Sequence, residues 1–269
     1  MNWTSFHHPD ISLPVIHRKV TEEWLDLLCG VGEILASRGR SLQWNHSYPN
    51  LQAYHNAMTR LRKKGLLVQT NAREMLPRLT LTEDAKQARP DYERPEKWWN
   101  AHWNGVWYLL IFDVPETERH YRNTLRKFMK QMRMGCLQKS VWITPRDIRP
   151  EYNDLEKAAA VDIVAYLLET RTVLHYDQSE IVQNTWDFGH LETLHRRYLD
   201  VFGENMERLR SEPCSEDDVM PLLYQEAEAY KHAMINDPLL PRSLLPKNYL
   251  GRKVFKLHIQ LREAMAERL

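Results

Sequence analysis

The sequence predicts an α+β protein in which helices and strands alternate over the first two thirds of the chain and helices alone fill the last third. Two observations predict this class. Short β-prone runs alternate with amphipathic helical segments up to about residue 178, and from Asn184 onward the apolar residues recur at helical spacing only. With 269 residues, the chain is long enough for two or three domains that each bury a core.

The N-terminal part contains two predicted helices and a predicted hairpin. Thr21 precedes three residues with two acids, which is typical of a helix start. A second helix is predicted over 51–64, because its apolar residues lie three or four apart and Gly65 can end it. The β-prone runs 66–70 and 77–82 are separated by a polar turn and predict a β-hairpin. This order is typical of a winged helix-turn-helix.

A winged helix-turn-helix binds DNA by placing one helix in the major groove, where amides, hydroxyls and arginines read base edges. Basic side chains on the hairpin and beside the helix neutralise phosphates. We expect Arg60 to read bases, and Arg62, Lys64, Arg73 and Arg78 to contact phosphates. Two alternatives stay open: 51–64 is an ordinary amphipathic surface helix, or Arg60 is a structural ion-pair residue. The candidate DNA-contacting residues are Gln52, His55, Asn56, Thr59, Arg60, Arg62, Lys63, Lys64, Arg73 and Arg78.

The middle of the chain reads as a small α/β sandwich. A buried strand is predicted over 106–112, an amphipathic helix over 117–134 and a further strand over 137–144. Later β-prone residues near 161–168 and 171–175 complete a pattern of the ferredoxin-like type.

The last part of the chain predicts a helical domain. Apolar residues at helical spacing define helices around 191–202, 219–234 and 251–269. Between the last two helices lies an irregular stretch, 237–246, which contains three prolines.

The net charge of +1 is a sum of opposing segments, because residues 38–78 carry +7, residues 119–149 carry +8 and residues 150–230 carry −12. Such asymmetry favours nucleic-acid contact or internal docking of opposite charges. The sequence contains no Gly-rich phosphate loop, and its longest uninterrupted apolar run is seven residues, so we expect neither a bound nucleotide cofactor nor a membrane span. Three scattered cysteines indicate reduced thiols and a cytoplasmic protein.

Asp113 at the end of the first central strand is the one candidate for metal chemistry. A carboxylate from each subunit of a dimer could hold Mg²⁺, which prefers oxygen ligands, and so support phosphodiester hydrolysis. The alternative is that Asp113 caps the following turn or pairs with Arg119 or Arg122. No second acid, histidine or nucleophile is placed by the sequence to complete a site, so we expect no catalytic residues, no resident metal and no enzyme.

Several motifs resemble PaaX-type transcriptional repressors, which regulate phenylacetate degradation and related aromatic catabolism in bacteria. The motifs are WYLLIFDVPE at 107–116, GCLQKSVWITP at 135–145, TWDF at 185–188, DPLLP at 237–241 and LLP at 244–246. The sequence departs from the family at His55, where family recognition helices commonly carry Arg. The resemblance covers about residues 21 to 265.

The resemblance implies a homodimeric repressor that binds double-stranded operator DNA and is released by an aryl-coenzyme A thioester such as phenylacetyl-CoA. It also implies a central ferredoxin-like domain similar to the small CRISPR-associated integration subunit. The alternative functions are a metal-dependent nuclease or CRISPR-associated factor built on that domain, and a protein-interaction module that uses the winged helix. The effector-binding residues stay unknown. The predicted parts are an N-terminal extension (1–20), a winged-helix domain (21–88), a linker (89–105), a ferredoxin-like central dimerisation domain (106–178) and a helical C-terminal domain (179–269).

Overall fold

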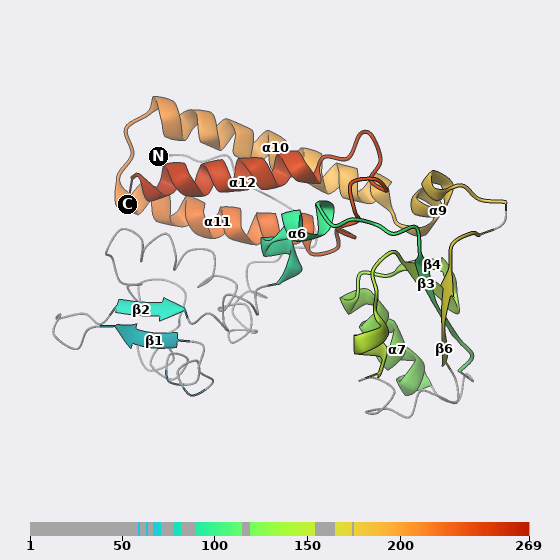
Figure 1. Ribbon diagram of the computed structural model, residues 1–269. Helices are drawn as coiled ribbons and strands as arrows, with labels where there is room; N and C mark the ends of the chain where they lie inside the picture. The colour runs from blue at the N-terminus through green and yellow to red at the C-terminus, as the bar shows by residue number, and fades with distance from the viewer. Residues whose placement is uncertain are drawn as a thin grey trace. The chain divides into compact units, whose positions relative to one another are not determined.

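The computed structural model describes residues 59, 63, 67–70, 78–81, 90–114, 119–153, 165–173 and 175–268 (Figure 1). The protein has the predicted α+β character, with a four-stranded antiparallel sheet and several long helices. The chain divides into two compact units, which we describe separately. The predicted domain boundaries stay predictions.

The predicted N-terminal hairpin is confirmed. Strand β1 (Leu67–Thr70) pairs antiparallel with strand β2 (Arg78–Leu81), so that Leu67 lies opposite Leu81 and Thr70 lies opposite Arg78 (Figure 1). Within the predicted recognition helix, Thr59 and Lys63 are helical. The other parts of the predicted winged helix lie outside the described residues.

The central sheet consists of β3 (Trp107–Phe112), β4 (Gly135–Gln138), β5 (Val141–Thr144) and β6 (Ala165–Thr170). Its strand order is β4-β5-β3-β6 and all neighbours are antiparallel. Helix α7 (Arg119–Gln131) connects β3 to β4. This order agrees with the predicted ferredoxin-like sandwich, and residues 154–164, where the second crossover is expected, lie outside the described residues.

Two strand predictions in this region were wrong. The single strand predicted over 137–144 is the hairpin β4–β5, with Lys139 and Ser140 at its turn and a register shift between Cys136 and Gln138. Among the residue types that usually mark a turn (Gly, Pro, Asn, Asp and Ser), this turn contains only Ser140. The β-prone segment after β6 does not extend the sheet, since β6 ends at Thr170.

The two faces of this sheet bury different clusters. Side chains alternate between the faces of a strand, so Tyr108, Leu110 and Phe112 of β3 pack with α7 on one face, which we call the α7 face. Trp107 of β3 and Ile143 of β5, which lies opposite Leu109, point to the opposite face, where they pack with α9 (Gln178–Thr185). We call this the α9 face.

The α9 face is only partly covered. The segment between the last two helices, residues 235–250, lies on it through Leu240 and Leu244, and we call this segment the strap. Farther along the edge strand β6, Tyr166 is 63% exposed and Leu168 is 47% exposed. The α9 face therefore carries both a core and an exposed apolar surface.

Most of the C-terminal bundle belongs to the unit that does not contain the central sheet. Its three long helices confirm the predicted helices of the C-terminal part. They are α10 (Phe188–Ser211), α11 (Glu216–Met234) and α12 (Gly251–Ala266) (Figure 1). The first residues of α10, the last residue of α11 and the first residue of α12 belong to the unit that contains the central sheet. Buried Glu226 on α11 accepts a hydrogen bond from the Tyr198 hydroxyl on α10, and its Oε1 lies 2.7 Å from His258 Nδ1 on α12. The Glu226 side chain thus joins all three helices.

Two short elements precede β3, a 3₁₀ helix at Asp91–Glu93 (η2) and helix α6 (Pro95–Trp99). The Tyr230 hydroxyl donates to the carbonyl of Tyr92 at 2.7 Å, which attaches η2 to α11. Within the described residues, no helix is long and apolar enough to cross a membrane.

Candidate functional site

Three of the ten predicted DNA-contacting residues lie on described elements. Thr59 and Lys63 are helical and exposed, and their spacing of four residues places them on one side of a helix. Arg78 is the first residue of β2 in the hairpin. The other seven lie outside the described residues, and their roles stay predictions: Gln52, His55, Asn56, Arg60, Arg62, Lys64 and Arg73.

Asp113 is exposed and directly follows β3, as predicted for a strand-end carboxylate. In the part of the chain that the structure describes, no three His, Cys, Asp or Glu side chains lie close enough to hold a metal ion. The metal role of Asp113, and the nuclease alternative with it, stay predictions.

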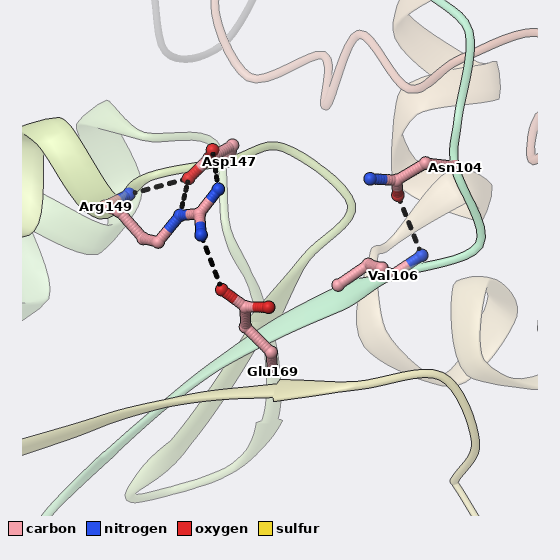
Figure 2. Close-up of polar contacts among 5 residues, drawn as sticks. All are labelled: Asn104, Val106, Asp147, Arg149 and Glu169. Atoms are coloured by element: carbon pink, nitrogen blue, oxygen red, sulfur yellow. Dashed lines mark hydrogen bonds and ion pairs between the residues drawn. The ribbon is translucent and has the colours of Figure 1, made fainter.

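A compact ion cluster lies at the rim of the α7 face (Figure 2). Arg149 donates from Nε and Nη2 to the two carboxylate oxygens of Asp147, at 2.9 and 2.7 Å, and its Nη1 lies 3.0 Å from Glu169 on β6. Its guanidinium also lies 5.7 Å from the ring centre of Tyr108. The hydrogen bond from Arg149 lowers the pKa of Asp147. Because these charges satisfy one another, the cluster joins the segment after β5 to β6 and offers little to a ligand.

A small pocket lies beside this cluster. Its volume is about 210 Å³, and its lining includes Trp98, His102, Tyr108 and Arg146. The Arg146 guanidinium lies 3.3 Å from the Trp98 ring centre, so cation and ring already form a cation–π contact. The hydrogen bond from the Val106 amide to Asn104 Oδ1, at 2.9 Å, fixes the turn that leads from this pocket into β3 (Figure 2).

A larger pocket of about 860 Å³ lies on the α9 face. Its walls come from Trp107 at the start of β3, residues 171–173 and 176–177, α9 and the strap. Ligand pockets in proteins usually measure about 300–1,000 Å³ and combine an apolar lining with a few polar groups. The larger pocket lies within this size range, and its lining combines apolar residues with about as many polar ones; the smaller pocket does not reach that size.

The strap wall of the larger pocket is held by buried Asp237. The Tyr249 hydroxyl donates to Asp237 Oδ2 at 2.6 Å, and the Leu239 amide donates to Oδ1 at 2.8 Å. Arg133, just after α7, donates to the carbonyl oxygens of Ile235 (3.0 Å) and Asp237. Burial raises the pKa of Asp237 to about 6. These contacts fix the strap at both ends and against the end of α7.

The sequence did not predict the larger pocket. Its walls are contributed by three stretches that lie far apart in the chain and carry no motif of ligand binding. One signal was present. Asp177 and Glu180 form a capping box, in which each side chain accepts the other residue's backbone N–H at 2.8 Å, and this D-x-x-E spacing could have identified the start of α9.

The comparison with protein families identifies most of the chain. Residues 100–182 match the model described as the PaaX protein central Cas2-like domain, and residues 186–268 match the PaaX-like protein C-terminal domain. Together the two matches cover more than half of the chain, in the order expected for one protein. The chain belongs to the PaaX family. The larger pocket of this PaaX-family protein is lined by residues from both matched stretches.

A solved structure shares the fold. The uncharacterized protein Rv0674 from Mycobacterium tuberculosis superposes with a TM-score of 0.54 at 20% sequence identity, over 91% of this chain and 95% of that one. No curated protein matches the sequence significantly. The PaaX-family domains suggest a transcriptional regulator of phenylacetic acid catabolism, a class of regulators and not of enzymes.

Proposed function

We propose that this PaaX-family protein is a cytoplasmic transcriptional repressor that binds operator DNA as a homodimer and is released by a small effector such as an aryl-CoA thioester. The match of both family domains, in order, carries the proposal. The exposed helical residues Thr59 and Lys63 and the β1–β2 hairpin support DNA contact by the N-terminal part.

Release from DNA would be a population shift. Two winged helices bind successive major grooves only when their separation matches the helical repeat of DNA. An effector that binds better to a dimer with another separation lowers the fraction of DNA-competent dimer. The effector therefore needs no contact with DNA.

Gel-shift assays test the DNA-binding part, with duplexes that the wild-type protein selects from a random-sequence pool. Arg60→Ala should weaken binding to the selected duplex by about 1–3 kcal/mol, the usual value of a bidentate base contact, and should leave binding to random duplex nearly unchanged. Arg73→Ala should weaken both, because phosphate contacts do not read sequence.

Lys139→Ala is the matched control, since Lys139 lies at the exposed β4–β5 turn. Unchanged affinity of Arg60→Ala for the selected duplex would contradict the proposed recognition helix. Light scattering of the free protein measures the dimer independently, and a monomer at the concentration of the gel shift would contradict the homodimer.

A further inference from the structure

The floor of the larger pocket is apolar and buried. Trp107 of β3 is 1% exposed, and Ile181 and Val182 on α9 are 2% and 1% exposed. Leu244 of the strap, 5% exposed, completes this floor. All four belong to the core cluster of the α9 face, so the pocket opens directly onto that core. An apolar group that enters here would extend a packed cluster.

An aromatic ring lies at the pocket without being buried. Tyr176 lines the pocket and is 52% exposed, in the segment that precedes α9. Large exposed aromatic side chains beside a concave apolar surface are typical of binding sites, because a bound ligand covers them.

The charged residues of the pocket favour an anion. Its lining contains the cations Arg171 and Lys247 and a single acid, Asp177, whose Oδ1 is occupied by the Glu180 amide. Arg171 Nη1 donates to the Asn104 carbonyl at 3.2 Å, which holds a guanidinium that is otherwise exposed. Within the described part of the chain, the exposed Lys247 has no ion-pair partner. Guanidinium and ammonium groups bind carboxylates and phosphates through charge-assisted hydrogen bonds.

We infer that this pocket is the effector site and takes an amphipathic organic anion, with an apolar group over Trp107 and an anionic part at Arg171 and Lys247. The assignment as an effector site rests on the proposed function, whereas the ligand class is inferred from the residues that line the pocket. A volume of about 860 Å³ lies in the upper part of the usual range for ligand pockets, so the ligand has an extended polar part in addition to its apolar group.

The pocket walls connect directly to two helices of the bundle. Helix α9 leads through Trp186 into α10, and the strap ends where α12 begins at Gly251. A ligand that binds better to one arrangement of α9 and the strap therefore biases the starts of α10 and α12 through the chain itself. This gives ligand binding on the α9 face a route to the rest of the protein.

Isothermal titration calorimetry of the full-length protein without DNA tests the site, with phenylacetyl-CoA, free CoA and phenylacetate as probes. We expect saturable binding of phenylacetyl-CoA, and weaker binding of each half. The combined substitution Arg171→Glu and Lys247→Glu should weaken binding of phenylacetyl-CoA at least tenfold without changing the melting temperature. Tyr176→Ala should weaken it several-fold. Lys139→Glu reverses one charge at the exposed β4–β5 turn, as each of the two pocket substitutions does, and should have no effect.

The inference is overturned if wild-type protein shows no saturable binding of phenylacetyl-CoA, or if the charge-reversed variant binds it as tightly as wild type. Equal affinity for free CoA and the thioester would overturn the role of the apolar floor. A failure of the proposed function is distinguishable, because loss of DNA binding appears only in the gel shift, whereas the calorimetry contains no DNA.

Discussion

The two faces of the central sheet are built from alternating residues of the same strands and nevertheless end as different surfaces. On the α7 face, an amphipathic helix covers a cluster that includes Leu110 and Met129, both fully buried. On the α9 face, a helix of eight residues and an irregular strap cover only part of the sheet, and a pocket of about 860 Å³ lies among them. A long covering helix closes a face, and short covering segments leave room for a ligand.

The largest difference between the faces should appear on truncation of apolar side chains. Leu110→Ala removes a fully buried side chain from the α7 face and should lower the free energy of unfolding by about 2–5 kcal/mol. Leu168→Ala, on the exposed part of the α9 face, should change it by about 0.5 kcal/mol or less. Urea denaturation measures both. Equal losses would show that the exposed surface of the α9 face is covered in solution.

A smaller effect is expected where β4 meets the end of α9. A Cβ at Gly135 would lie 2.6 Å from Trp186 Cε2 and closer still to the Thr185 methyl group. Gly135→Ala should therefore cost about 1–3 kcal/mol by overpacking. The control is Gly203→Ala in α10, where an added Cβ meets nothing within 4 Å. This substitution should stabilise the helix by about 0.5–1 kcal/mol. A neutral Gly135→Ala would mean that α9 moves away from β4 at little cost.

The strap should show a pH dependence of similar or smaller size. Burial raises the pKa of Asp237 from its usual 3.8 to about 6, so the folded state binds more protons than the unfolded state between these values. The contribution of Asp237 to stability is therefore fully present below pH 4 and is lost as the pH rises through 6. Relative to Asp237→Asn, the wild type should lose about 1–2 kcal/mol between pH 4.5 and pH 7.5. Parallel pH profiles of the two proteins in thermal unfolding would contradict this assignment.

The smallest effect is expected at the ion cluster on the rim of the α7 face. Arg149, Asp147 and Glu169 are about half exposed, and exposed ion pairs contribute little to stability because solvent screens them. Arg149→Ala should leave the denaturation midpoint unchanged within error, both at low salt and in 1 M salt. A measurable loss of stability at low salt would contradict this and would show that the ion cluster stabilises the α7 face.

The parts of the fold that could be predicted are those with a local pattern. The apolar run that forms β3 and the helical spacing of α7, α10, α11 and α12 were read correctly, because each pattern lies within one segment. Ser140 is the one common turn-forming residue in the turn at Lys139 and Ser140, and α9 is a short helix rich in polar residues, so neither was predicted. The DNA-contacting residues at the N-terminus remain predictions.

The pocket could not be predicted, because the residues that line it lie far apart in the sequence. Trp107 and Leu244 lie in the same core cluster, but the rest of the sheet, α9, α10 and α11 separate them in sequence. Only the folding of the strap onto the sheet brings them together. For the same reason, no sequence pattern marks Arg171 and Lys247 as residues of one pocket.

The late position of the strap in the chain has a consequence for synthesis. The ribosome makes the sheet and α9 first, and the strap follows only after α10 and α11 are complete. Until then, Trp107 and Ile143 lack Leu240 and Leu244, which complete their cluster. The nascent chain therefore carries an open apolar sheet surface through a long part of elongation, a situation in which chaperone binding or aggregation competes with folding. A fragment that ends before the strap should retain this liability permanently.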